Sequence, residues 1–522
     1  MKNEKSGKKQ GGLLRSTGIV SLFTMLSRVL GLARDVVVAH LFGAGGGADA
    51  FFVAFKIPNF FRRLFAEGAF SQAFVPVLSE YRAQREHAEV RLLVSYTMGS
   101  LGGVLFGVTL VCVVFAPVVT FLFAPGFYDL PDKFSLASDM LRLTFPYLML
   151  ISLTAMLGSV LNSYGRFAMP AFNPVLLNIC MIFAAVVVSP LLEVPVMAMA
   201  WGVLVAGVLQ LVFLFPFVRR IDLLAMPRWG WTDPGVKRIL TLMLPAMFGV
   251  SVAQINLLLD TILASFLVDG SVGWLYYSDR LMELPLGVFG IAIATVILPS
   301  LSRKHASRSA EAFSQTLDWA VRMVLLIGVP AALALVVLAS PLLVTLFQYG
   351  EFSARDVERA SLSLQAYGCG LVGFMLVKVL APGYFARQDT KTPVKVGIKA
   401  MVANMVFNLA LIVPLAHVGL ALATTLSAAV NAGLLWRGLR REGVYQVQPG
   451  WWLFLLRLGV ASALMVAVIM LLNKDLAQWL AWGWPQRTAH LALLVVAGAG
   501  AYFGVLLVGG MRLRDLRARH GE

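Results

Sequence analysis

Residues 92–121 read LLVSYTMGSLGGVLFGVTLVCVVFAPVVTF and contain no charged side chain. A helix needs about 20 predominantly apolar residues to cross the hydrocarbon core of a bilayer, so this stretch is long enough to span one. The same character extends over the whole chain of 522 residues, of which 59% are hydrophobic and 13% are charged. Soluble chains carry about 25% charged residues. The composition therefore excludes a soluble multidomain protein and predicts an all-α polytopic membrane protein.

Further apolar runs of spanning length, separated by polar residues or by Gly and Pro, predict about 14 transmembrane helices. Charged residues interrupt the first, second, seventh and eighth of these runs. The predicted helices cover residues 14–42, 48–78, 92–121, 137–162, 170–190, 194–218, 237–267, 271–301, 314–346, 357–386, 394–414, 417–437, 451–473 and 488–511.

Lysine and arginine are distributed unequally between the two sets of predicted loops. An even number of helices places both termini on one side, and that side carries 27 of these cations. The opposite loops carry five, which are Lys133, Arg355, Arg359, Lys474 and Arg487. Because cytoplasmic loops are enriched in Lys and Arg, both termini are predicted to be cytoplasmic. The net charge of +16 then indicates contact with an anionic lipid surface, not with nucleic acid.

An internal repeat is visible at an offset of 223 to 225 residues. The matching pairs are DVVVA (35–39) with DTILA (260–264), FVPVLS (74–79) with ILPSLS (297–302), and Pro170 with Pro393. The repeat predicts two pseudo-symmetric six-helix halves, residues 1–220 and 221–440, followed by two extra C-terminal helices and a basic tail in 441–522. Parallel repeats of this kind are typical of transporters with a substrate cavity between the halves.

Seven cations and five acids lie inside the first, second, eighth and tenth predicted helices, and a charge at the bilayer centre costs roughly 2.5–3.5 kcal/mol even on a lenient scale. Four other cations, Arg142, Arg322, Lys399 and Arg457, lie nearer helix ends and are interpreted as snorkelling to the interface. The seven cations are Arg28, Arg34, Lys56, Arg62, Arg63, Arg280 and Lys378, and the five acids are Asp35, Asp49, Glu67, Asp279 and Glu283.

The excess of cations over acids favours a wet cavity that binds a polyanion, because the guanidinium group matches the geometry of phosphate. Asp279 and Glu283 are four residues apart, so they share a helix face beside Arg280. The alternative is a set of structural ion pairs, and it applies to some pairs, such as Arg34 with Asp35 or Glu67.

Helix breakers accompany these charges in both halves. Residues 43–47 (GAGGG) and 268–271 (VDGS) separate helices, while Pro58 and Pro285 interrupt helices. Bending at these positions would open and close a cavity, as alternating access requires. The alternative is a set of static kinks.

A second group of polar side chains has the character of a cation site. Asp260, Asn404, Asn408 and Thr424 offer carboxylate, amide and hydroxyl oxygens that could bind Na⁺. The alternative is hydrogen bonding between helices, for which Asn and Thr are commonly used in membranes.

Four motifs carry a resemblance to a known family. They are SRVLGLARD (27–35), ADAFFVAFKIPNFFRRLFAEGAFSQAFVP (48–76), YYSDRLMELP (276–285) and QDTKTP (388–393). The chain closely resembles the MurJ (MviN) family of bacterial lipid II flippases, within the multidrug/oligosaccharidyl-lipid/polysaccharide exporter superfamily. The resemblance covers essentially the whole chain.

The resemblance implies a 14-helix transporter and not an enzyme, because the family consists of flippases. It would carry lipid II, an undecaprenyl-diphosphate-linked disaccharide-pentapeptide, from the inner to the outer leaflet of the bacterial cytoplasmic membrane. Carried onto this chain, the diphosphate-binding cations are Arg28, Arg34, Arg62, Arg63, Arg280 and Lys378. The acids that organise these cations or gate the cavity are Asp49, Asp279 and Glu283.

The resemblance also implies that the two extra helices form a groove for the polyprenyl tail. Some relatives bind Na⁺ in the second half, and this chain matches their pattern except that Asn408 stands where an acid is expected. The membrane potential would help to move the anionic headgroup outward. Expected partners are membrane lipids and the machinery of cell-wall synthesis or division, with the chain itself a monomer.

Three other functions are compatible with a polytopic chain. A flippase for another polyprenyl-diphosphate-linked glycan would need the same cations, whereas a cation-coupled MATE-like drug exporter should prefer acids over arginines in its cavity. A membrane glycosyltransferase would need acids or His on substantial outward loops, and the outward loops here are short. A scaffold of the division machinery would leave the intramembrane arginines unexplained.

Overall fold

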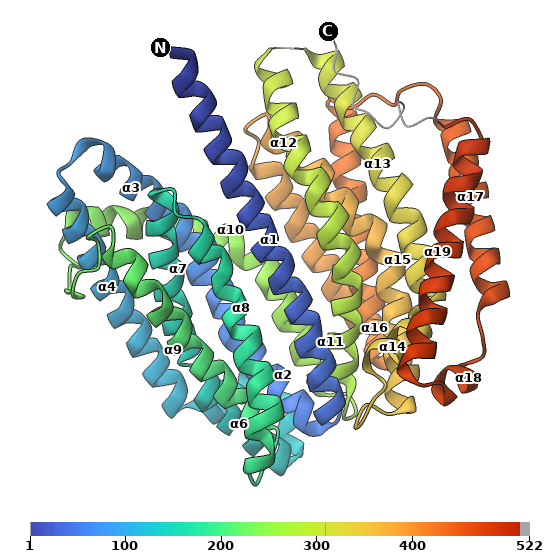
Figure 1. Cartoon of the computed structure of the whole chain (residues 1–522), viewed down its shortest axis with the longest axis horizontal. Helices are drawn as coiled ribbons and strands as arrows, with labels where there is room; N and C mark the ends of the chain where they lie inside the picture. Colours follow the sequence, from blue (N-terminus) through green and yellow to red (C-terminus); the bar gives the residue numbers. More distant parts are fainter. Residues whose placement is uncertain (1, 308, 512–522) are drawn as a thin grey trace. The chain divides into compact units, whose positions relative to one another are not determined.

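The structure is a computed structural model that describes residues 2–307 and 309–511. The regular secondary structure of these residues is helical, and none of them forms a β-strand. The chain divides into two compact units, unit 1 (Met1–Gly270) and unit 2 (Ser271–Glu522). Figure 1 shows the helices of unit 1 in blue to green and those of unit 2 in yellow-green to red.

Unit 1 packs around a core to which α3, α4, α7 and α9 contribute buried aromatic and aliphatic side chains. Phe70 and Phe74 stack within this core. The elements of unit 1 are α1 (Lys2–Phe42), α2 (Gly46–Arg62), the π-helix η1 (Arg63–Phe70), α3 (Ser71–Gln84), α4 (His87–Val114), α5 (Ala116–Phe123), η2 (Pro125–Asp129), α6 (Pro131–Thr144), α7 (Tyr147–Ser163), α8 (Ala168–Phe183), η3 (Ala184–Val188), η4 (Ser189–Leu191), α9 (Met197–Arg219) and α10 (Pro234–Ser265).

Unit 2 packs α15 against α11, α13 and α16, while α17 and α19 pack against each other. Ser353 and Asp356 form a capping box that starts α15. The elements of unit 2 are α11 (Ser271–Pro285), the π-helix η5 (Leu286–Gly290), α12 (Ile291–Ala306), α13 (Ala310–Val337), α14 (Ala339–Phe347), α15 (Ala354–Phe385), α16 (Lys391–Arg441), α17 (Trp451–Leu472), α18 (Leu476–Ala481) and α19 (Trp484–Val508).

All fourteen predicted stretches are helical over most of their length, which confirms the all-α prediction. Nine helices among the described residues are long and apolar enough to cross a membrane, and they account for ten of the fourteen stretches. One of them, α16, contains two predicted helices, and the break between them lies at Ala416, where φ is 49°. The four stretches outside this set are the charge-interrupted ones, so the count of fourteen crossings stays a prediction.

The boundary between the units differs from the boundary that the repeat predicts. Helix α10, placed in the second half by the repeat, packs against η1 and α3 and belongs to unit 1. The units are defined by packing, whereas the repeat predicts which helices are related by symmetry. The packing therefore does not test the two predicted halves, and they stay a prediction. In their support, π-helices begin at Arg63 in unit 1 and at Leu286 in unit 2, which are 223 residues apart.

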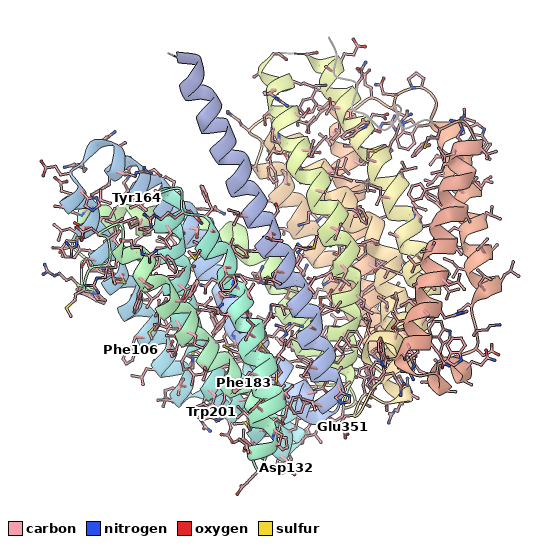
Figure 2. The ribbon with its side chains drawn as sticks, in the orientation of Figure 1. Phe106, Asp132, Tyr164, Phe183, Trp201 and Glu351 are labelled. Atoms are coloured by element: carbon pink, nitrogen blue, oxygen red, sulfur yellow. The ribbon has the colours of Figure 1, made fainter. Side chains whose placement is uncertain are left out.

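The outer faces of the unit 1 helices carry large apolar side chains. Phe106 on α4, Phe183 on α8 and Trp201 on α9 are exposed (Figure 2). Exposed apolar side chains of this size mark a surface that contacts another apolar phase, and here the apolar helices of spanning length identify that phase as lipid.

The segment that joins α9 to α10 lies closely against α4. The N–H of Arg228 donates to the carbonyl oxygen of Ser95 at 3.1 Å, and the N–H of Gly230 donates to the Ser100 hydroxyl at 3.1 Å. Glycines on α4 allow this approach, since a Cβ at Gly99 would lie 2.1 Å from the carbonyl oxygen of Arg228. The segment is therefore fixed to α4 by its backbone.

Candidate substrate-binding site

Arg34 and Asp35 form a buried ion pair on α1. Arg34 is only 5% exposed, and its Nη2 lies 2.7 Å from Oδ1 of Asp35. The guanidinium also donates to Oδ1 of Asn178 on α8 at 3.1 Å, and the Asn178 amide donates to the carbonyl oxygen of Ser27 at 3.0 Å. The structural ion pair predicted for Arg34 is thus confirmed with Asp35. Arg34 pairs with Asp35 on its own helix and donates to Asn178 on α8, so it fixes the packing of α1 against α8.

Asp49 near the start of α2 belongs to a second cluster of charges. Its Oδ2 accepts from Nζ of Lys133 at 3.0 Å and from the N–H of Gly270 at 2.8 Å. Lys133 also bonds Oδ1 of Asp269 at 2.6 Å and lies over the ring of Phe127. Asp49 and Lys133 are both buried. The cluster ties α2, α6 and the turn after α10 together within unit 1.

This cluster corrects the placement of Lys133 as a cation of an open outward loop. Lys133 lies in the first turn of α6, where it is buried against two carboxylates. No local feature of the sequence indicates this burial, because both acidic partners are distant along the chain.

The other predicted cations of unit 1 are more accessible. Arg28 on α1, Lys56 on α2 and Arg63 at the start of η1 are exposed. Arg62 at the end of α2 is half-buried, and its Nε donates to Oδ1 of Asn59 at 3.0 Å. Glu67 lies in η1, but its side chain is outside the described part of the structure.

In unit 2 the charged residues of the YYSDRLMELP motif lie on α11. Nη1 of Arg280 lies 3.2 Å from Oε2 of Glu283, and Nη2 donates to the Tyr276 hydroxyl at 3.4 Å. The guanidinium also lies over the ring of Tyr276. Asp279 on the same helix is half-buried. Sequence reasoning missed Tyr276, although its spacing of four residues from Arg280 places both on one helix face.

Lys378 lies on α15 and is exposed, so its ammonium group is available to a ligand. Arg28 and Arg63 are similarly exposed within unit 1, and the side chain of Arg280 in unit 2 is 37% exposed. Guanidinium and ammonium groups that solvent reaches can bind phosphate oxygens through charge-assisted hydrogen bonds. Each unit therefore presents accessible cations at positions that the sequence predicts.

The four residues of the predicted Na⁺ site divide between the units. Asp260 is half-buried on α10 in unit 1, while Asn404 and Asn408 are buried on α16 in unit 2. The Thr424 hydroxyl, also on α16, donates to the carbonyl oxygen of Leu420 at 3.0 Å. All four donors are oxygens of the type that hard cations prefer.

Two arginines of unit 2 have different roles from those predicted. Arg322 does not snorkel freely, because its Nε lies 2.8 Å from Oδ2 of buried Asp318. Arg487, placed in an outward loop, is buried at the start of α19. It donates to the carbonyl oxygens of Trp479 and Gln348 at 3.0 and 2.9 Å. Both arginines hold unit 2 together.

The chain is similar in sequence and in fold to known proteins. The family described as MurJ, lipid II flippase, matches residues 38–486. A curated relative from Vibrio cholerae serotype O1, "Probable lipid II flippase MurJ", is 52% identical over 97% of this chain and 98% of its own. A solved structure titled "Lipid II flippase MurJ, inward closed conformation" covers 94% of this chain and 99% of its own, with 25% identity and a TM-score of 0.77.

A second solved structure, the inward-facing conformation of a multidrug resistance MATE family transporter of the MOP superfamily, shares the fold. It is 17% identical and matches with a TM-score of 0.62 over 82% of this chain and 98% of its own.

Proposed function

Because this chain belongs to the MurJ family of lipid II flippases, we propose that it moves lipid II from the inner to the outer leaflet by alternating access, with the diphosphate bound in a cationic cavity. It is a multi-pass protein of the bacterial inner membrane and a transporter, not an enzyme. The observation that carries the function is the 52% identity, over nearly the whole chain, to a curated relative named "Probable lipid II flippase MurJ".

The accessible cations support the proposed mechanism. The side chains of Arg28, Arg63, Arg280 and Lys378 are accessible, and they come from four predicted helices that together carry seven cations and five acids. Arginine binds phosphate with two parallel hydrogen bonds, so a diphosphate can engage more than one of them. Arg34, held by Asp35 and Asn178, positions α1 and contributes positive potential. The acids of the motifs, Asp49, Asp279 and Glu283, organise the cations or gate the cavity.

The membrane potential supplies a driving force in this mechanism. An inside-negative potential favours outward movement of an anion by roughly 2.3 kcal/mol per charge for each 100 mV. The polyprenyl tail remains in lipid along the groove of α17 and α19. Both termini lie in the cytoplasm, as the distribution of Lys and Arg predicts, and the chain acts as a monomer near the wall-synthesis machinery.

The oxygen atoms of Asp260, Asn404, Asn408 and Thr424 are of the type that binds hard cations, and we propose Na⁺ as the cation to test. A single carboxylate among the four makes binding weak, so we expect a low affinity. Calorimetric titration of the full chain with Na⁺ tests this step, with Asp260→Asn as the variant that should abolish the signal. Equal heats from the wild type and this variant would remove Na⁺ from the mechanism.

The flippase mechanism is tested by measuring lipid II in the outer leaflet of cells depleted of the wild-type chain. Arg280→Ala should fail to restore outer-leaflet lipid II, because it removes an accessible cation. Arg142→Ala is the matched control, since Arg142 also pairs with an acid three residues away and is similarly exposed. Restoration by both variants would exclude Arg280 from the binding of the diphosphate.

A further inference from the structure

A polar cavity of about 200 Å³ lies inside unit 1, among α2, α7, α8 and α9. Its polar lining residues are Arg62, Thr154, Ser159, Asn162, Asn173 and Gln210. Polar groups among apolar helices cost free energy unless they find hydrogen-bond partners. A cavity with this lining is therefore a candidate for a polar ligand.

Gln210 is the best-defined group in this cavity. It is 2% exposed, and its Nε2 donates to the main-chain oxygen of Asn173 at 3.1 Å. Only the nitrogen of the amide can donate, so this bond fixes the orientation of the side chain. Its Oε1 is buried and receives no hydrogen bond from the part of the chain that the structure describes. Asn173 is 4% exposed, and its Oδ1 is also buried and receives no hydrogen bond from the described residues.

The hydroxyl groups of the lining are also acceptors towards the cavity. Thr154 donates its proton to the carbonyl oxygen of Leu150 at 2.8 Å, and Ser159 donates to that of Ala155 at 2.9 Å. Each hydroxyl has a single proton, so only lone pairs remain. The buried lining thus needs hydrogen-bond donors, and an unsatisfied buried acceptor costs about 1–3 kcal/mol.

Arg62 distinguishes between the two kinds of ligand that oxygen acceptors can bind, a metal cation and a hydrogen-bond donor. Oxygen acceptors could also bind a metal cation, but the guanidinium of Arg62 in the same lining repels one. A ligand that brings N–H or O–H groups and carries an acceptor or anion towards Arg62 therefore matches this lining. Complete ligand pockets measure about 300–1,000 Å³, so this cavity holds only part of a larger ligand.

We propose that this cavity is a subsite for the sugar–peptide part of the lipid II headgroup, whose N–H and O–H groups donate to Gln210 and Asn173. Arg62 then faces the anionic part of the same headgroup. This inference rests on the proposed function, because it names a part of the same cargo. The subsite gives selectivity for the complete headgroup, since sites built to pair with polar groups discriminate against ligands that lack them.

The test uses the full chain in detergent and three lipids: lipid II, the same lipid without its pentapeptide, and undecaprenyl diphosphate. Gln210→Leu and Asn173→Leu should each weaken binding of lipid II about tenfold, the loss of one good hydrogen bond. Binding of undecaprenyl diphosphate should stay unchanged, which also shows that the variants are folded. Gln84→Leu, at an exposed glutamine of α3, is the matched control.

The three lipids separate the outcomes. A loss seen only with the complete headgroup assigns the subsite to the peptide, and a loss that persists without the pentapeptide assigns it to the sugars. Wild-type affinity of both Leu variants for lipid II would overturn the inference. So would equal affinity of the wild type for lipid II and undecaprenyl diphosphate, a comparison that needs no variant. Failure of the wild type to bind any of the three would instead overturn the proposed function.

Discussion

The ion pair of Arg34 and Asp35 in unit 1 and that of Arg280 and Glu283 in unit 2 both join residues close in sequence, but their surroundings differ. The side chains of the first pair are 6% and 4% exposed, and those of the second are 37% and 47% exposed. A buried pair is costly to break, whereas an exposed pair contributes little to stability and can exchange its partner. Charges in similar motifs therefore serve different purposes, with the first pair structural and the second open to a ligand.

The largest effect is expected where unit 1 buries most charge. Lys133→Met leaves the buried carboxylate of Asp49 without its cation, so the variant should lose about 3–5 kcal/mol of stability. Thermal unfolding in detergent measures the loss, and Lys474→Met, at an exposed lysine of unit 2, should change little.

A double-mutant cycle makes this prediction sharper. Asp49→Asn in the Lys133→Met background should recover part of the stability, because it removes the uncompensated charge. If Lys133→Met unfolds like Lys474→Met, the cluster does not stabilise unit 1 and the contrast between the units is weaker than the geometry indicates.

The second prediction compares the two pairs directly by one chemical change. Asp35→Asn removes the charge beside buried Arg34 and should destabilise the chain by about 3 kcal/mol. Glu283→Gln alters an exposed pair and should stay within about 0.5 kcal/mol. Unfolding midpoints of both variants measure the difference. Equal shifts would show that exposure does not separate the roles of the pairs.

Much of this arrangement follows from the sequence. The helices could be predicted because their apolar runs are long, and the Arg34–Asp35 pair because its members are adjacent. The burial of Lys133 could not be predicted, since Asp49 and Asp269 meet it only through the packing of distant segments. The acceptors Asn173 and Gln210 carry a weak signal, as isolated amides in apolar helices, but only packing shows that they line one cavity.

A third prediction asks whether the tight packing of unit 1 includes its last connecting segment. Gly99→Ala places a Cβ 2.1 Å from the carbonyl oxygen of Arg228, so α4 and the segment must move apart. Overpacking of this kind costs about 1–3 kcal/mol. Gly107→Ala on the same helix is the control, because nothing lies within 4 Å of its added Cβ. A Gly99→Ala variant as stable as the control would mean that the segment is not fixed.

The smallest effects are expected at two carboxylates outside the predicted membrane helices, Glu80 in unit 1 and Asp389 in unit 2, whose pKa values are lowered. The hydrogen bond and charge of Arg238 lower the pKa of Glu80 in unit 1 from its ordinary 4.5. Hydrogen bonds from Thr392 lower the pKa of Asp389 in unit 2 from its ordinary 3.8. Both carboxylates then stabilise the fold above their ordinary pKa, and this contribution is lost as the pH falls through the lowered values.

Salt should distinguish these two carboxylates. The contribution of Glu80 depends on an exposed ion pair, so it should shrink between low and high ionic strength. The contribution of Asp389 depends on hydrogen bonds within a turn and should persist in salt. It should shrink in Thr392→Val, which removes the side-chain hydrogen bond and with it part of the pKa shift, while the bond from the N–H of residue 392 remains. Unfolding midpoints of Glu80→Gln and Asp389→Asn, followed below about pH 4.5 at two salt concentrations, measure both effects. An equal response of the two variants to salt would mean that Asp389, too, is held by charge, and the contrast between the units would then not extend to their surfaces.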